Sequence, residues 1–261
     1  MITVRDGKTR ILPDRAPRGR SAPDWSAFDR VYCVHYLPYS DRLPLVRAEL
    51  ARVGVPDDRL EFYYTVPNRY YGLLFYSDSP IASPDVNLTN LNYAVNSYNM
   101  LKQIWHLGYE RVLVLEDDVA FLKDLGALAE RLADIPDCDL AMLEYFVGSS
   151  DHDYAGAHRR MVEGNERAGR HWVRFSAERL YDTGAFALSR RMVRHMIDCA
   201  ERRLMPFDGY TCASGAPDDA SLTRCASVVP LAIQRPRADR QDAGEDLDKY
   251  AGWVREEDYA L

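Results

Sequence analysis

The sequence predicts an α/β fold, in which a mainly parallel sheet is flanked by helices. Short apolar runs of strand length alternate with amphipathic helical patterns through the first roughly 150 residues, which is typical of parallel sheets. The first run, Val31 to Val34, is continuously apolar, as expected of a strand buried on both faces. The chain has 261 residues, 47% of them hydrophobic, and is therefore long enough to bury a sizeable core.

The first half of the chain predicts a strand, helix, strand, helix, strand order. The first helix shows Leu43, Val46, Leu50 and Val53 at helical spacing, with Ser40 or Asp41 as its cap and Gly54 at its end. A second strand follows in "LEFYYTV". A longer helix is expected over residues 88–106 and ends before Gly108, and the strand "RVLVLEDDVAF" comes next.

The second half predicts shorter elements. An amphipathic helix is expected in "LKDLGALAERLADI", with Leu122, Leu125, Leu128 and Leu132 on one face. Ser189 is the expected cap of a helix in "SRRMVRHMIDCAERRL". Strands are expected in "CDLAMLEYF", "HWVRFS", "TGAFALS" and, last, "SVVPLAIQRP".

The composition changes at both ends of the chain. We expect a flexible arm over residues 1–25, one folded domain over 26–236 and a charged extension over 237–261. No stretch reaches the roughly 18 apolar residues of a membrane span, and the N-terminus lacks an apolar signal core. The five cysteines are scattered and odd in number, which disfavours a disulfide framework. These features together predict a cytoplasmic protein.

The net charge of −7 argues against a nucleic-acid binder, because phosphate backbones are bound by basic surfaces. Phosphate-binding glycine loops, the G-x-S-x-G nucleophile motif and the H-E-x-x-H zinc motif are also missing from the sequence.

Three consecutive acids, Glu116, Asp117 and Asp118, end the apolar run "RVLVL". Burying unpaired carboxylates is costly, and neighbouring ones repel each other. In open α/β sheets, ligands bind beyond the carboxyl ends of the strands, which is where these acids are expected. The residues predict a site for Mg²⁺ or Mn²⁺ holding a phosphorylated substrate. The alternative is a solvated acidic loop.

Four segments, in order, resemble glycosyltransferase family 25, the lipooligosaccharide and collagen galactosyltransferases. They are "VYCVHYLPYSDR", "NSYNMLKQIWHLGYERVLVLEDDV", "YDTGAFALSRRMVRHMI" and "MPFDGY…SVVPLAIQRP", and together they cover about residues 28–236. The sequence departs from the family at His35, where the family has Asn, and at Asn96-Ser97, where it has Ser-His. The aromatic insert at 67–87 has no counterpart; it is either a sugar platform or packing.

The resemblance implies a single GT-A domain that inverts the anomeric carbon of a nucleotide sugar, with a UDP-hexose such as UDP-galactose as donor and Mn²⁺ or Mg²⁺ as cofactor. Asp118 is expected to ligate the metal directly. Glu116 and Asp117 are expected to contact metal-bound water or the ribose, and Glu116 is also a candidate metal ligand. Tyr36 and Arg42 are expected to contact the donor, although Arg42 has a second interpretation as the partner of a nearby acid.

The resemblance places the catalytic base at Asp208, with Asp218 and Asp219 as further candidates. Each has a structural alternative: Asp208 is an exposed loop acid, and the other two are dipole partners at a helix start. Two other classes of function remain open. One is a non-catalytic sugar- or nucleotide-binding relative, and the other is a metal-dependent phosphohydrolase or nucleotidyltransferase.

The resemblance makes a bacterial surface glycan, and so lipopolysaccharide biosynthesis, the expected context, with lipid-linked, peptide and small-molecule acceptors as alternatives. Basic residues of the N-terminal arm make peripheral contact with the inner membrane face a further alternative. The sequence does not determine the oligomeric state.

Overall fold

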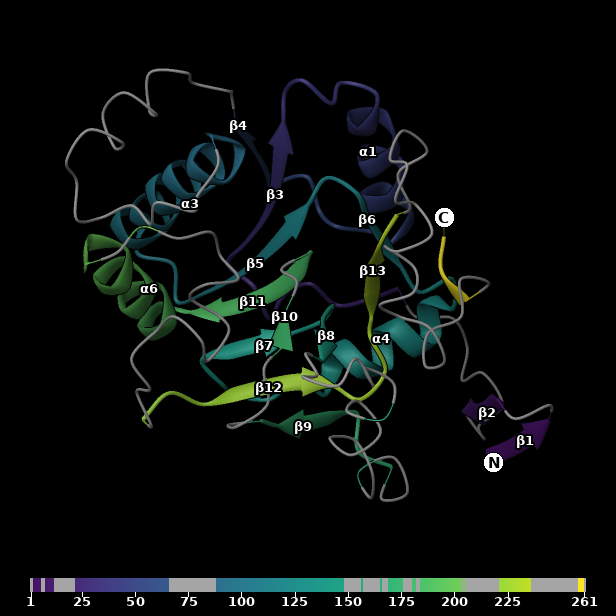
Figure 1. Ribbon diagram of the computed structural model, residues 1–261. Helices are drawn as coiled ribbons and strands as arrows, with labels where there is room; N and C mark the ends of the chain where they lie inside the picture. Colours follow the sequence, from purple (N-terminus) through teal and green to yellow (C-terminus); the bar gives the residue numbers. More distant parts are fainter. Residues whose placement is uncertain are drawn as a thin grey trace.

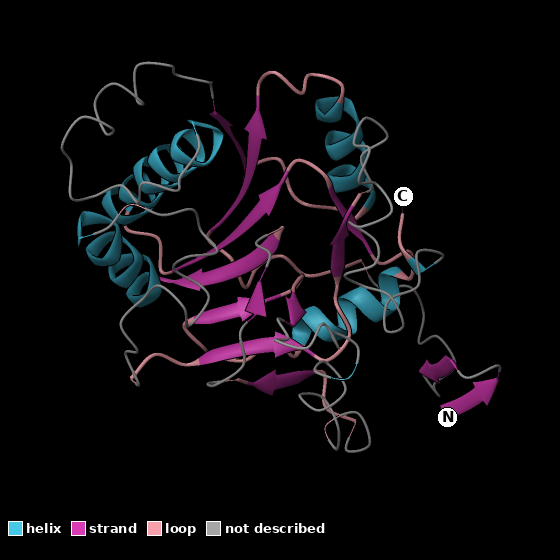
Figure 2. Cartoon of the chain, viewed as in Figure 1, coloured by secondary structure: helices cyan, strands magenta, loops and turns pink. Residues whose placement is uncertain are grey.

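The computed structural model describes residues 2–5, 8–11, 22–65, 88–147, 156, 165, 169–175, 180–181, 184–202, 204, 221–235 and 258–260. These residues form an α/β fold with a central sheet flanked by helices (Figures 1 and 2). The fold class predicted from the sequence is therefore confirmed.

Seven strands form the central sheet, and most run in one direction. β3 pairs in parallel with both β4 and β5, while β11 runs antiparallel between β5 and β7. β12 continues parallel to β7, and β9 closes the edge antiparallel to β12. In sheet order the strands are β4 (Leu60–Thr65), β3 (Arg30–Tyr36), β5 (Arg111–Glu116), β11 (Ala185–Ser189), β7 (Leu140–Met142), β12 (Arg224–Ser227) and β9 (Trp172–Arg174).

Three smaller antiparallel pairs accompany the sheet. β6 (Val119–Phe121) pairs with β13 (Ala232–Gln234), which brings a late part of the chain beside the acidic triplet. The other two pairs are β8 with β10 and β1 with β2. Their bounds are Phe146–Val147, Leu180–Tyr181, Ile2–Arg5 and Lys8–Ile11 respectively.

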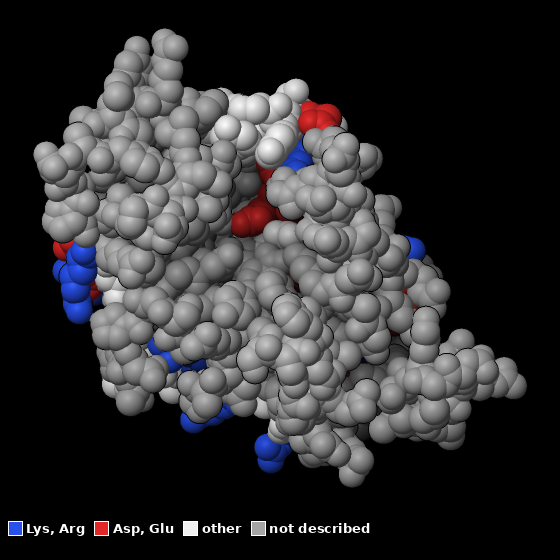
Figure 3. Space-filling model, in the orientation of Figure 1, with Lys and Arg blue, Asp and Glu red and all other residues white. Residues whose placement is uncertain are grey.

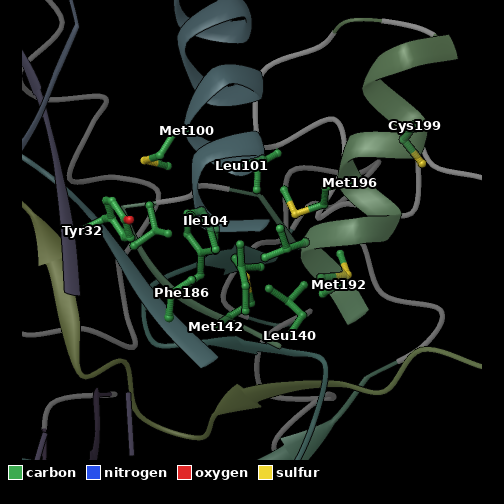
Figure 4. Close-up of a cluster of buried hydrophobic side chains, with 14 of the residues drawn as sticks. Tyr32, Met100, Leu101, Ile104, Leu140, Met142, Phe186, Met192, Met196 and Cys199 are labelled. Atoms are coloured by element: carbon green, nitrogen blue, oxygen red, sulfur yellow. The ribbon is translucent and has the colours of Figure 1, made fainter. Parts of the chain in front are cut away.

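Helices cover both faces of the sheet (Figure 1). On one face, α3 (Leu88–Leu107) and α6 (Arg190–Arg202) pack on a cluster that includes Tyr32, Phe186 and Met196, drawn in Figure 4. On the other face, α1 (Arg42–Arg52) and α4 (Leu125–Ala133) cover a second cluster. Successive residues of a strand point to opposite faces, so each strand of the central sheet contributes side chains to both clusters.

Local signals explain most helix ends. Ser189 Oγ accepts the backbone N–H of Met192 at 3.1 Å, which confirms it as the cap of α6. Gly54 and Gly108 adopt φ of +73° and +77° just after α1 and α3, a conformation that ends helices and favours glycine. α4 begins at Leu125 rather than Leu122, because Asp124 accepts the N–H groups of Gly126 and Ala127.

The last predicted strand is two strands instead of one. β12 ends at Ser227 and β13 begins at Ala232, with Pro230 between them. Proline lacks the N–H that a central strand would need, so the chain leaves the sheet and pairs with β6. The four described cysteines, Cys33, Cys138, Cys199 and Cys225, are buried and free. None of the described helices is long and apolar enough to span a membrane.

Residues 258–260 dock onto the segment that follows the acidic triplet. Tyr259 is 2% exposed, forms a bridge with Leu122 and donates its hydroxyl hydrogen to Pro230 O at 2.8 Å. Burial raises the pKa of this hydroxyl above its ordinary value, so Tyr259 is neutral. These contacts tie the end of the described chain to β6.

We expect Tyr259→Ala to lower the free energy of unfolding by about 3–5 kcal/mol, because it leaves a cavity in the core. Tyr259→Phe should cost about 1 kcal/mol, since it removes one hydrogen bond and keeps the ring. Chemical denaturation measures both. Leu107→Ala, at an exposed position, is the control and should stay within about 0.5 kcal/mol. Equal stability of Tyr259→Ala and the wild type would contradict this docking.

Candidate functional site

The acidic triplet lies where the chain leaves the central sheet. Glu116 is the last residue of β5, and Asp117 and Asp118 form the turn into β6. Because β3, β4 and β5 are parallel, their carboxyl ends meet at the same edge. Figure 3 shows acidic atoms at the bottom of a hollow in this region, with a basic group at its rim.

Glu116 is held by two donors from distant parts of the chain. Tyr93, on α3, donates its hydroxyl hydrogen to Oε1 at 2.6 Å. Gln234, at the end of β13, donates from Nε2 to Oε2 at 3.0 Å. Both carboxylate oxygens therefore already accept a hydrogen bond, and the side chain has a fixed orientation.

Asp117 is buried among donors of the β3 end. His35 Nδ1 and the Tyr36 N–H lie 2.7 and 3.2 Å from Oδ2. Arg42 Nη1 donates to Oδ1 at 2.8 Å. His35 is only 1% exposed and Asp117 only 5%, so this is an interior hydrogen-bonding network rather than a surface one.

Asp118 shares the same arginine. Arg42 Nη1 lies 3.0 Å from Asp118 Oδ2, so one nitrogen contacts two carboxylates. The backbone carbonyl of Asp118 accepts the N–H of Arg235 at 2.7 Å, which fixes the turn. The Arg42 guanidinium also lies over the Tyr39 ring, 4.4 Å from its centroid.

The electrostatics explain how the chain tolerates this cluster. Desolvation acts to lower the pKa of Arg42, but the charges of Asp118 and Asp117 outweigh it and raise the pKa above its ordinary value. Arg42 therefore stays positively charged at all relevant pH values and offsets part of the repulsion between the acids.

A further buried carboxylate, outside the triplet, lies behind it. Glu144 follows β7 at the same edge, is fully buried and accepts the N–H of Gly184 at 2.8 Å. The carbonyl of Gly184 accepts the N–H of Glu116, also at 2.8 Å. A Cβ at position 184 would lie 2.7 Å from Glu144 Oε2 and 3.2 Å from Gln234 Cγ, so only glycine fits here without rearrangement.

The structure brings together five of the residues singled out in the sequence: Tyr36, Arg42, Glu116, Asp117 and Asp118. Of the two interpretations of Arg42, the structure shows the pairing with nearby acids. Tyr36 contributes its backbone N–H, and its ring packs edge-on against Tyr39 at 5.1 Å. Asp208, Asp218, Asp219 and the insert at 67–87 lie outside the described residues, so their roles stay predictions.

Sequence reasoning missed four contributors to the site: Tyr93, Gly184, Gln234 and the polar role of His35. Gln234 does stand in the "PLAIQ" segment used for the resemblance, which was the available signal. Tyr93 packs, partly buried, against the cluster beneath α3, and nothing in its spacing points to Glu116. His35 stands where the resembled family has Asn, and nothing in the sequence pairs it with Asp117.

The carboxylates of the triplet fit a hard divalent cation only as part of its ligand shell. Among the described residues, no three His, Cys, Asp or Glu side chains converge as a complete metal site. Mg²⁺ and Mn²⁺ bind through oxygen, and Mg²⁺ sites commonly use one or two carboxylates and complete the shell with water and substrate phosphates. Glu116 and Asp118 are both candidates for that part: Glu116 accepts hydrogen bonds from two neutral donors, as ligating carboxylates commonly do, and Asp118 Oδ2 accepts one from Arg42.

We expect Gly184→Ala to lower the free energy of unfolding by about 1–3 kcal/mol, because the added methyl overpacks against Glu144 and Gln234. Gly126→Ala is the matched control. Its Cβ would lie 3.3 Å from the capping Oδ1 of Asp124, a side-chain atom that has to shift only slightly, and alanine favours a helix, so any loss of stability should stay below about 1 kcal/mol. Chemical denaturation of both variants tests the close approach, and a Gly184→Ala protein as stable as the wild type would contradict it.

Comparisons with known proteins give distant similarities only. No protein-family model matches the sequence, and no curated protein matches it. Among solved structures, the chain is similar to mannose-1-phosphate geranyltransferase from Thermus thermophilus, at 14% identity and a TM-score of 0.39, covering 84% of this chain and 76% of that one.

A second structure is the mannosyltransferase PcManGT from Pyrobaculum calidifontis, in complex with GDP-Man and Mn²⁺. The identity is 15% and the TM-score 0.37, over 80% of this chain and 59% of that one. Similarities this distant carry no conclusion about activity, which has to be argued from the residues of the site.

Proposed function

We propose that the protein is a divalent-metal-dependent glycosyltransferase, which moves a sugar from a nucleotide diphosphate to an acceptor hydroxyl. The main support for this proposal is that Asp117 and Asp118 both contact the Arg42 guanidinium at the carboxyl edge of the sheet. Carboxylate oxygens suit a hard cation, and a guanidinium suits phosphate oxygens. A sugar diphosphate with its cation combines both needs in one substrate.

Each residue would act through the contacts it already makes. Asp118 would hold the cation, which when bound supplies charge stabilisation to the leaving diphosphate. Glu116, oriented by Tyr93 and Gln234, would accept a hydrogen bond from metal-bound water or a ribose hydroxyl. Asp117 would hold the end of β3 and Arg42 in place.

The finer parts of the proposal follow the resemblance to glycosyltransferase family 25. They are inversion at the anomeric carbon, a UDP-hexose as donor and a glycan as acceptor. A carboxylate near the acceptor would remove the hydroxyl proton as it attacks. Asp208 is the proposed base, with Asp218 and Asp219 as the other candidates.

A thermal-shift screen against UDP-, GDP- and dTDP-sugars, with and without Mn²⁺, tests the function and names the donor. A ligand at 100 times its dissociation constant stabilises the native state by about 2.7 kcal/mol. For a chain of this size we expect a rise in melting temperature of about 5–10 °C, with the correct donor and only with metal.

Other outcomes separate the alternatives. A shift with free phosphate or a nucleoside triphosphate, equal to that with any nucleotide sugar, would favour a phosphohydrolase or nucleotidyltransferase. A shift without turnover of any sugar would favour a binding protein. No shift with any nucleotide sugar at saturating metal would count against the proposal.

We expect Asp118→Asn to lose the metal-dependent shift and to lower transfer by at least about a hundredfold, because the amide is a poor ligand for the cation. Asp198→Asn, at a solvent-facing ion pair with Arg194, is the matched control and should keep both properties. Initial rates at several Mn²⁺ concentrations measure the effect. Full metal-dependent transfer by a folded Asp118→Asn protein would remove Asp118 from this role.

A further inference from the structure

One guanidinium nitrogen lies between two carboxylates of the candidate metal site. Arg42 Nη1 lies 2.8 Å from Asp117 Oδ1 and 3.0 Å from Asp118 Oδ2. The Arg42 side chain is 13% exposed and both carboxylate side chains are 6% exposed. Water therefore screens these contacts weakly, and the arginine is a built-in counter-cation of the two acids.

The surrounding segment preorganises this arginine. Arg42 is the first residue of α1, and its backbone N–H bonds the carbonyl of Tyr39 at 3.0 Å. The ring of the same Tyr39 lies under the guanidinium, and Tyr36 packs edge-on against that ring. The guanidinium is thus held from both ends, by the acids and by an aromatic platform.

A divalent ion at Asp118 would meet this positive charge at close range. Like charges a few ångströms apart repel by several RT at the effective dielectric of a protein surface. The ion would also compete with Arg42 for Asp118 Oδ2. Metal alone therefore has to bind against a cation that is already present.

A diphosphate changes this balance. Its oxygens give the guanidinium new acceptors of the geometry that arginine prefers. Arg42 can then turn from Asp118 to the phosphates, and Asp118 becomes available to the ion. By linkage, the factor by which diphosphate tightens metal binding equals the factor by which metal tightens diphosphate binding.

We propose that Arg42 is a resident cation which makes metal binding depend on the donor, so that the ion binds weakly alone and tightly together with the nucleoside diphosphate. This inference rests on the proposed function, because it needs a metal at Asp118. It adds to that function an order of occupancy, in which the ion binds tightly only once the nucleotide is bound.

The test is a titration of free Mn²⁺, followed by electron paramagnetic resonance, with and without UDP or GDP. For the wild type we expect the nucleotide that carries the correct base to tighten Mn²⁺ binding by at least about tenfold. Arg42→Gln should bind Mn²⁺ alone about tenfold more tightly than the wild type, because the competing charge is gone. Its tightening by nucleotide should fall below about threefold.

Two further variants complete the design. Arg47→Gln removes an arginine of the same helix that contacts Tyr64 and the Phe62 ring rather than the acids, and should behave as the wild type. Arg42→Lys keeps the charge but offers a compact ammonium in place of the planar guanidinium. It should bind Mn²⁺ alone as weakly as the wild type, because the charge remains. Its tightening by nucleotide should fall below about threefold, because the ammonium lacks the fork that matches phosphate oxygens, and this keeps the inference testable where Arg42→Gln fails to fold.

The outcomes separate this inference from the proposed function. Absence of Mn²⁺ binding by the wild type with every nucleotide overturns both. Strong coupling in the wild type, with Arg42→Gln binding Mn²⁺ alone no more tightly or with Arg42→Lys keeping the full coupling, overturns the role of Arg42 and leaves the function standing. Unchanged coupling in Arg42→Gln has the same consequence.

Discussion

The burial of negative charge at the end of β5 is the constraint around which this edge of the molecule is organised. Asp117 and Asp118 are each almost entirely removed from solvent, and unpaired carboxylates in such surroundings would destabilise the fold by several kcal/mol. Donors to the triplet come from several elements: the β3 end, the first residue of α1, the N-terminal half of α3 and the last residue of β13. Each acid of the triplet accepts a hydrogen bond from a group far from it in sequence.

The same requirement explains the path of the second half of the chain. After β12 the chain leaves the main sheet, and β13 pairs with β6. This places Gln234 on Glu116 and the Arg235 N–H on the Asp118 carbonyl. The Arg235 guanidinium then holds the carbonyl of Ala260, in the segment that Tyr259 anchors to the core. Late residues of the chain therefore fix the geometry of a turn that lies more than a hundred positions earlier.

Packing behind the acids leaves little freedom for the site. Glu144 fills the space beneath Gly184, whose carbonyl in turn holds the backbone of Glu116. Such a layer keeps the triplet rigid, and a rigid set of charges acts on a substrate without first being rearranged. Arg42 is less rigidly fixed than the acids. Its guanidinium is held by ion pairs and a ring contact, and the oxygens of a phosphate can replace the carboxylate oxygens as its partners.

Local sequence patterns predict the fold class, most of the described strands and helices, and the place of the acidic triplet at the end of a buried strand. These features depend on local patterns, such as the apolar run before Glu116 and the caps at Ser189 and Gly54, which need no knowledge of distant residues. The groups that compensate the acids depend instead on how distant elements pack together. Sheet order and helix packing bring three of these groups to the acids: Tyr93, Gln234 and His35. The spacing of residues along the chain predicts neither the sheet order nor the helix packing.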